Sequence, residues 1–215
     1  MKKFYSALVF ITTIISVPSL SQTWQWAKQF GGNGNDRAYN ISTDAFGNSY
    51  VAGEFQDSIS FGSQMFYSHG FSDMFFLKLD TSGNVIWALT YGSNDYDYGQ
   101  EIIADDNGNC YLLGAFHDTL IVGGFTLISA GIMDMFLAKI DANQNIVWAK
   151  RGGGTGNDEP FALSLDDSGN IYVVTPFQGT AYFENDSVDS QGGYDNALVK
   201  YDNNGNELCG NKCWW

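Results

Sequence analysis

Identical residues recur in this chain at a fixed spacing of 61 positions. Three tryptophans and two sets of three aspartates follow this spacing: Trp26, Trp87 and Trp148; Asp36, Asp97 and Asp158; Asp73, Asp134 and Asp195. Repeats of this length are supersecondary units that must stack on one another to bury their apolar faces. Because the spacing does not drift over three copies, we interpret these nine residues as parts of a repeated scaffold.

A short turn motif, Asp-x-x-Gly-Asn, divides each unit into two hairpins. Its six copies begin at Asp44, Asp80, Asp105, Asp141, Asp166 and Asp202. The Asp carboxylate caps a type I turn, and the Gly adopts a positive φ that a Cβ would disfavour. In the copy at Asp141 the Gly is replaced by Gln144. We therefore predict that Gln144 is left-handed, at a cost of roughly 1 kcal/mol.

Apolar runs of three to five residues flank these turns, for example Tyr50-Val51-Ala52 and Ile146-Val147-Trp148-Ala149. Short runs rich in β-branched and aromatic residues, bounded by Gly, Asn and Asp, indicate strands. A variable stretch between the hairpins, such as residues 58–72, is expected to form a small extra ribbon. Four main strands per unit, stacked face to face, predict an all-β fold of antiparallel beta-propeller blades.

The repeat supplies about three blades, in units of approximately 26–86, 87–147 and 148–208, followed by a degenerate tail at 209–215. Propellers usually have about four or more blades, so we expect an open or incomplete propeller. Its unpaired end strands would invite self-association, and the chain would be a fragment of a longer protein or half of a dimeric ring. The competing architecture is a closed three-fold arrangement of sheets, as in a β-prism.

The first 21 residues have the pattern of a secretory signal peptide. Lys2 and Lys3 precede an apolar run at residues 4–17, and small residues stand before an expected cleavage site at Gln22. Such a segment is too short to remain as a membrane span. We expect residues 22–215 to be the beta-propeller repeat region of an exported protein that is secreted, periplasmic or at the cell surface.

The chain is acidic, with a formal net charge of −14 at pH 7. This charge argues against nucleic acid or an anionic membrane surface as a partner. Of the three cysteines, Cys110 lies in a predicted strand and should be buried. Cys209 and Cys213 could form a local disulfide in an exported protein. A metal site there is less favoured, because two ligands in one short stretch are too few.

The segments GNSYVAGEF and GNCYLLGAF, paired with DMFFLKLDTSGNVIWA and DMFLAKIDANQNIVWAK, resemble the bacterial beta-propeller repeats called SBBP. The resemblance covers nearly the whole chain after the leader. It implies a propeller fold, and it says little about activity, since such repeats occur in exported and surface proteins. The chain departs from the repeat at Gln144, at Thr175 and Pro176, and at Cys209, which occupies the last Trp position.

No catalytic or cofactor motif is present in a usable context. His69 and His117 do not recur in the other units. The turn DDNGN is similar to the start of an EF-hand loop, but Phe116 stands where that loop needs a bidentate acid. We therefore expect no cofactor. Looser calcium binding by the turn carboxylates is the alternative to plain turn capping.

A functional surface should lie where the copies differ. The candidate binding residues are aromatic and lie in loops or variable stretches: Tyr67, Phe71, Tyr96 and Tyr98. Such residues can contact carbohydrate or protein, or they can pack against their own loops. We expect an exported, non-enzymatic scaffold or interaction module that binds protein or carbohydrate at the cell surface. The alternative is a carboxylate-dependent hydrolase or lyase acting at the blade tops.

Overall fold

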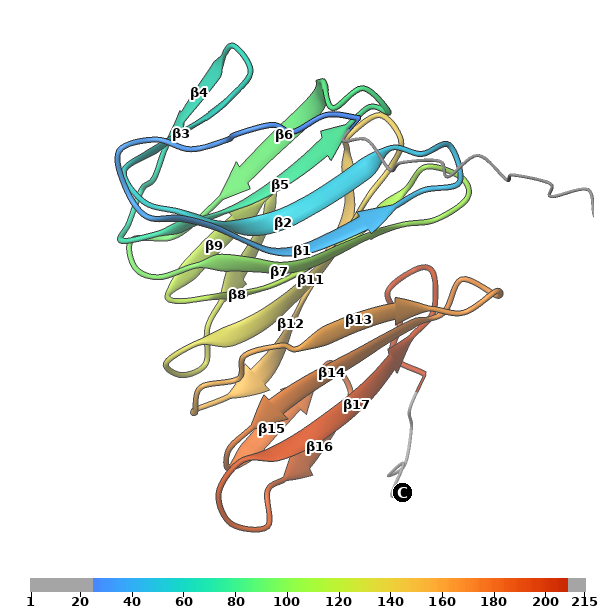
Figure 1. Cartoon of the computed structure of the whole chain (residues 1–215). Coiled ribbons are helices and arrows are strands. Elements are labelled where there is room, and N and C mark those ends of the chain that lie inside the picture. Colours follow the sequence, from blue (N-terminus) through green and yellow to red (C-terminus); the bar gives the residue numbers. More distant parts are fainter. Residues whose placement is uncertain (1–24, 209–215) are drawn as a thin grey trace, which may run out of the picture.

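The computed structural model describes residues 25–208 and is all-β within them, as the sequence predicts. Three main antiparallel sheets stack on one another, and none closes into a barrel (Figure 1). Among the described residues, no helix is long and apolar enough to cross a membrane. The expected signal peptide and the Cys209–Cys213 pair lie outside the described residues.

Blade 1 is a four-stranded antiparallel sheet in the order β1-β2-β5-β6. Its strands are β1 (Asp36–Thr43), β2 (Ser49–Phe55), β5 (Asp73–Leu79) and β6 (Val85–Tyr91). A two-stranded ribbon, formed by β3 (Ser58–Phe61) and β4 (Gln64–Tyr67), is inserted between β2 and β5. This ribbon confirms the prediction for the variable stretch.

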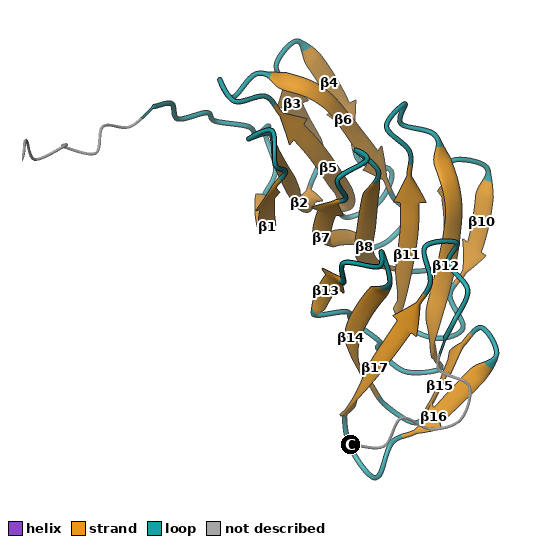
Figure 2. Ribbon diagram, turned by 90° about the vertical axis from the view of Figure 1, so that its right-hand side faces the viewer, coloured by secondary structure: helices purple, strands orange, loops and turns teal. Residues whose placement is uncertain are grey.

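Blade 2 repeats the same order, and its last strand is longer. Its strands are β7 (Tyr98–Ala104), β8 (Cys110–Phe116), β11 (Asp134–Ile140) and β12 (Ile146–Gly154), with the ribbon β9 (Thr119–Val122) and β10 (Phe125–Ile128). Cys110 is buried, as predicted. In Figure 2, β7, β8, β11 and β12 lie side by side across the middle of the molecule.

Blade 3 has three paired strands. They are β13 (Ala162–Leu165), β14 (Ile171–Phe177) and β17 (Asp195–Tyr201), and its ribbon is β15 (Thr180–Phe183) and β16 (Asp186–Asp189). β15 pairs with the extended end of β12, so blade 2 and the ribbon of blade 3 form one six-stranded sheet. The propeller is therefore an open arc of about three blades.

The six predicted turns follow one hydrogen-bonding scheme. In the copy at Asp80, one carboxylate oxygen accepts the N–H groups of Ser82 at 2.9 Å and Asn84 at 2.8 Å. The other oxygen accepts the Asn84 side-chain amide at 3.0 Å. Hydrogen bonds from Asn170 are the main cause that lowers the pKa of Asp166 to about 2. These carboxylates are occupied in capping their own turns.

Gln144 is left-handed with φ of 70°, which confirms the prediction from the missing glycine. The glycines have a second role at this turn. A Cβ on Gly83 or on Gly205 would come within 2.8 Å of the indole of Trp26 or of Trp148, respectively. Trp26 and Trp148 thus each pack against the turn glycine 57 residues later in the sequence. Gln144 is the residue at the same spacing from Trp87.

Apolar side chains fill the spaces between blades. Tyr50, Ala52 and Phe76 of blade 1 share a buried cluster with Leu112 and Phe136 of blade 2. A second cluster joins blades 2 and 3. Trp87 and Trp148 are 8% and 7% exposed in these clusters, whereas Trp26 is only half-buried because no sheet includes its segment.

Candidate functional site

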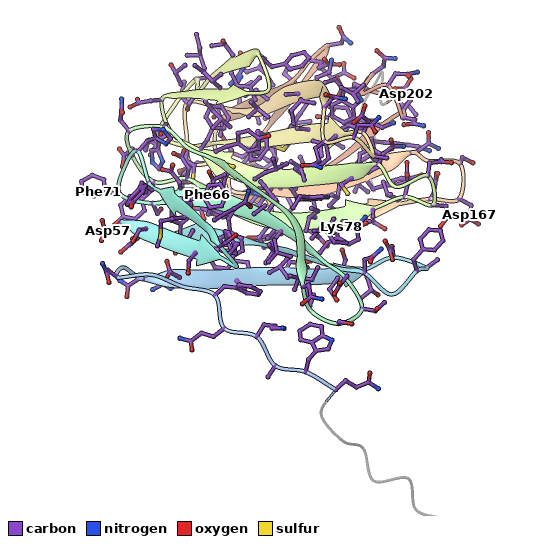
Figure 3. All side chains as sticks on the ribbon, turned by 90° about the horizontal axis from the view of Figure 1, so that it is seen from above. Asp57, Phe66, Phe71, Lys78, Asp167 and Asp202 are labelled. Atoms are coloured by element: carbon purple, nitrogen blue, oxygen red, sulfur yellow. The ribbon has the colours of Figure 1, made fainter. Side chains whose placement is uncertain are left out.

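The first strands of the three blades begin around one open concavity of about 770 Å³. Its lining comes from all three blades: Asn35, Arg37, Tyr39, Glu54, Gln56, Tyr96, Tyr98, His117, Ile132, Met133, Asn157, Glu159 and Tyr194. The loops at this end of the strands include Asp57 and Phe71, and the turn residues Asp167 and Asp202 lie at the opposite end (Figure 3). The concavity is therefore separate from the Asp-x-x-Gly-Asn turns.

Six of the lining residues stand directly beside the repeated aspartates Asp36, Asp97 and Asp158. Asn35, Tyr96 and Asn157 precede those aspartates in the three units, and Arg37, Tyr98 and Glu159 follow them. The aspartates are the same in every copy, while the residue that follows differs in all three copies and the residue that precedes is Asn in two of them and Tyr in the third. This change of identity beside an invariant position is the sequence signal that could have identified Arg37 and Glu159. A choice restricted to aromatic loop residues misses it.

Hydrogen bonds and one ion pair hold the polar groups of the concavity in place. The Tyr98 hydroxyl donates to Glu159 Oε2 at 2.9 Å, and this bond joins blade 2 to the start of blade 3. Arg37 Nη1 lies 3.2 Å from Glu54 Oε1. Burial, and then the nearby Glu159 carboxylate, raises the pKa of Tyr98. Tyr98 is therefore a neutral hydrogen-bond donor at the wall of the concavity.

Aromatic rings add an exposed apolar surface beside these polar groups. The Tyr39 and Tyr98 rings pack with centroids 5.6 Å apart. Tyr39, Tyr96 and Tyr194 are 43%, 47% and 58% exposed. A site that combines exposed tyrosines with fixed donors and acceptors suits a ligand that has both apolar faces and hydroxyl or amide groups.

The four aromatic residues selected from the sequence separate into three places. Tyr96 and Tyr98 line the concavity. Phe71 stacks on Tyr96, with centroids 5.4 Å apart and an interplanar angle of 16°, so it supports one edge of the site. Tyr67 ends β4, is 68% exposed and does not line the concavity.

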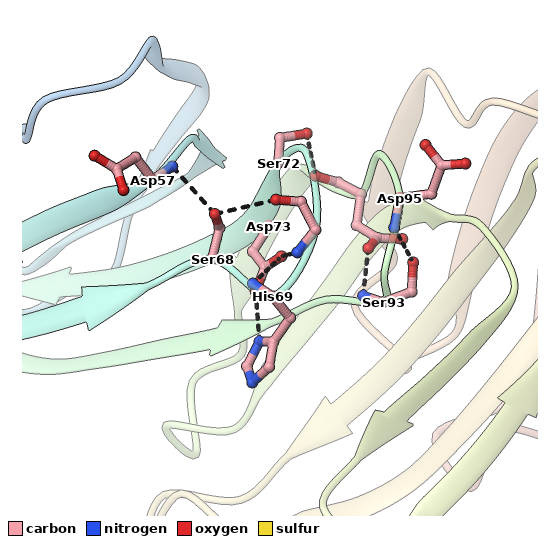
Figure 4. Close-up of polar contacts among 9 residues, drawn as sticks. Asp57, Ser68, His69, Ser72, Asp73, Ser93 and Asp95 are labelled. Carbon is pink, nitrogen blue, oxygen red and sulfur yellow. Dashed lines mark hydrogen bonds and ion pairs between the residues drawn. The ribbon is translucent and has the colours of Figure 1, made fainter.

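The repeated aspartates lie behind the site and close loops. Asp36, Asp97 and Asp158 accept the N–H of the residue four positions earlier, and Asp73, Asp134 and Asp195 do the same. Figure 4 shows this for Asp73, which accepts the N–H of His69 at 3.1 Å and lies 2.8 Å from its ring Nδ1. These contacts are those of a scaffold.

The same aspartates also lie at the blade junctions. The Asp97 N–H donates to the Ser72 carbonyl at 3.0 Å, and the Asp158 N–H donates to the Met133 carbonyl at 2.8 Å. Burial, helped by the nearby Asp73, raises the pKa of Asp97 to about 6. Within residues 25–208, no group of three or more His, Cys, Asp or Glu side chains is placed to hold a metal ion.

Comparison with known proteins gives one family and two distant relatives. Residues 25–54 match the model of the SBBP family, described as a beta-propeller repeat. The chain is 28% identical over 145 residues to the regulatory protein FlaEY of Caulobacter vibrioides, a match that covers 64% of this chain and 15% of that protein.

A further match, to an uncharacterized WD repeat-containing protein, L264, of Acanthamoeba polyphaga mimivirus, has 22% identity over 121 residues. It covers 48% of this chain and 9% of that protein, so the chain spans only a small part of either relative. The family match confirms the resemblance found in the repeated segments. The chain therefore resembles beta-propeller repeat proteins of the SBBP type, and the family match covers residues 25–54.

Proposed function

We propose that this protein is an exported, non-enzymatic interaction module that binds protein or carbohydrate at the concavity formed by the first strands. One observation carries the proposal. The copies agree in the buried aspartates, and they differ in the side chains that reach the concavity, such as Arg37, Tyr98 and Glu159. Side chains that change from copy to copy on a repeated scaffold, at a place where three blades converge, are typical of a recognition surface.

The charges of the site favour binding over acid–base chemistry. The carboxylate of Glu54 is paired with Arg37, and that of Glu159 accepts hydrogen bonds from Tyr98 and Asn157. Carboxylates held by such partners are fixed hydrogen-bond acceptors that can orient a ligand. The names of the two relatives, a regulatory protein and a WD repeat protein, suggest a similar non-enzymatic role.

The test is glycan-array and protein-library binding with residues 22–215, followed by affinity measurements on matched variants. Tyr96→Ala removes an exposed ring of the concavity and should weaken binding at least tenfold, which corresponds to about 1.4 kcal/mol. Tyr67→Ala removes an exposed ring outside the concavity and should leave affinity unchanged. Equal losses in both variants would show that the concavity is not the binding site.

The alternative hydrolase or lyase rests on two carboxylates from different blades, Glu54 and Glu159, in one concavity. Turnover of a bound glycan that disappears in Glu159→Gln, with binding retained, would support this alternative. Export is tested separately by expressing the full chain and determining the mature N-terminus. We expect it at Gln22, and a product that retains Met1 in the producing cell would contradict export.

A further inference from the structure

Blade 3 exposes a face that is buried in the other two blades. Leu198 on β17 is 47% exposed, whereas Phe76 and Leu137, at the same repeat position in blades 1 and 2, are 0% exposed. Tyr172 and Val174 on β14 are half-buried, and their counterparts in blades 1 and 2 are buried: Tyr50, Ala52, Tyr111 and Leu113. We call Tyr172, Val174 and Leu198 the front face of blade 3.

Blade 1 exposes the complementary surface. Ile41 on β1 is 63% exposed, whereas its counterparts Ile102 and Leu163 are 0% and 4% exposed because the preceding blade covers them. Val51 on β2 is half-buried, and its counterpart Leu112 is fully buried. We call Ile41 and Val51 the back face of blade 1. Within residues 25–208, one front face and one back face are thus left uncovered, and two such pairs of faces pack together inside the chain.

The outer edge of β17 is also incomplete within the described residues. In blade 2 the corresponding strand, β11, pairs with β12, with Lys139 opposite Trp148 and Leu137 opposite Lys150. In blade 3 only the first positions of that strand are filled, by a Tyr201–Glu207 bridge and a hydrogen bond from the Leu208 N–H to the Lys200 carbonyl. The residues that follow, 209–215, lie outside the described part of the chain.

Residues 25–30 have the sequence and the pose of the missing strand. Trp26-Ala27-Lys28 repeats Trp148-Ala149-Lys150. The Trp26 indole donates to the Thr81 carbonyl at 3.0 Å, and the Trp148 indole donates to the Asn203 carbonyl at 3.3 Å, which is the equivalent contact in the last blade. Trp26 therefore packs on blade 1 as Trp148 of the outer strand β12 packs on blade 3. Among the described residues, no sheet contains residues 25–30.

We propose that a second copy of this chain covers these surfaces in a head-to-tail arrangement. The front face of blade 3 in one copy packs on the back face of blade 1 in the other, and residues 26–30 of that copy add to β17. The repeat sets the register, with Lys200 opposite Trp26 and Leu198 opposite Lys28. Two identical junctions then close a ring of six blades.

The test is a disulfide at the predicted register, in a full chain that carries Cys209→Ser and Cys213→Ser. The pair Lys28→Cys and Leu198→Cys places two thiols opposite each other across adjacent strands, at a distance that a disulfide spans. The control pair, Gln29→Cys and Leu198→Cys, points one side chain to the other face of the strand. We expect mild oxidation to give a covalent dimer with the first pair and several-fold less with the control.

Sedimentation velocity of the chain without added cysteines is the second measurement, and we expect a concentration-dependent dimer. A folded monomer at the highest soluble concentration overturns the proposal, and so does equal cross-linking in both pairs. Cross-linked species beyond the dimer overturn closure into a ring of two. Labelling of the Leu198→Cys thiol with a thiol reagent tests whether the chain's own tail covers this face. If the monomer reacts only after residues 209–215 are deleted, the tail covers the face, and the proposal is overturned.

Discussion

Blades 2 and 3 are built from the same repeat, but their strands are buried differently. Every residue of β8 and β11 is buried, because blade 2 has a neighbour on both faces. In β14 buried residues alternate with half-buried ones, because only one face of blade 3 is covered. A sheet that is covered on one side shows such alternation. The comparison teaches that neighbouring blades, more than the strand sequence, decide what is buried.

The largest expected effect is at the tryptophans. Trp148→Ala should lower the free energy of unfolding by about 3–5 kcal/mol, because the indole is buried between blades 2 and 3 and lies on Gly205. Trp26→Ala is the matched control and should cost about half as much, since Trp26 is only half-buried. Urea denaturation followed by circular dichroism measures both. Equal costs would show that the missing blade does not matter at this position.

Two leucines at one repeat position compare the blades directly. Leu137→Ala in blade 2 should destabilise by about 2–5 kcal/mol, because the side chain is fully buried. Leu198→Ala in blade 3 should cost less than about 1 kcal/mol in dilute protein, because the side chain is 47% exposed. Denaturation at two protein concentrations sharpens this prediction. If a second copy covers Leu198, its cost should rise with concentration, whereas the cost at Leu137 should not.

The junction aspartates predict a pH effect of about 1 kcal/mol. The pKa of Asp97 is raised to about 6 in the folded chain from an ordinary value of 3.8, so folding favours the protonated carboxyl. Stability should therefore rise as pH falls from 7 to 5. The turn aspartates act in the opposite direction only at lower pH, since the pKa of Asp166 is about 2 in the folded chain.

Thermal denaturation between pH 4 and 8 measures this effect, with Asp97→Asn as the control. The variant loses one of the hydrogen bonds that the carboxylate accepts from the N–H groups of Ser93 and His117, so its stability should be lower at every pH. What identifies the aspartate is the slope. The gain in stability from pH 7 to pH 5 should be smaller in the variant than in the parent chain. An unchanged gain would show that other titratable groups cause it.

The smallest effect concerns the second turn of blade 2, where the left-handed backbone position holds Gln144 and the matching turn of blade 3 has Gly205. Gln144→Gly should stabilise by roughly 0.5–1 kcal/mol, because Gln144 is left-handed with φ of 70°. Gly205→Gln in blade 3 should have the opposite sign and a larger size, because a Cβ there would come within 2.8 Å of the Trp148 indole. Melting temperatures decide the matter. A lower value for Gln144→Gly would mean that the Gln side chain stabilises the turn through contacts of its own.

The sequence predicted local structure well because each turn encodes its own geometry. The Asp and Gly of every Asp-x-x-Gly-Asn copy indicated where strands end, and the irregular copy at Gln144 still predicted the backbone correctly. The concavity was harder to predict, because Arg37, Tyr98 and Glu159 are far apart in sequence and meet only when three blades stack. Tyr67 was also proposed from the sequence as a binding residue, but it lies in the ribbon strand β4. The repeat spacing does not show whether a ribbon residue lies near the concavity.

The pairing of β12 with β15 has a consequence for how the molecule comes apart. Backbone hydrogen bonds run without interruption from β7 of blade 2 to β16 of blade 3. In the described residues no such ladder joins β6 to β9 at the first junction, where isolated backbone hydrogen bonds, such as that from the Asp97 N–H to the Ser72 carbonyl, and packed side chains carry the contact. Under tension, or in native-state hydrogen exchange, the second junction should behave as one cooperative unit, and the first blade should detach before it.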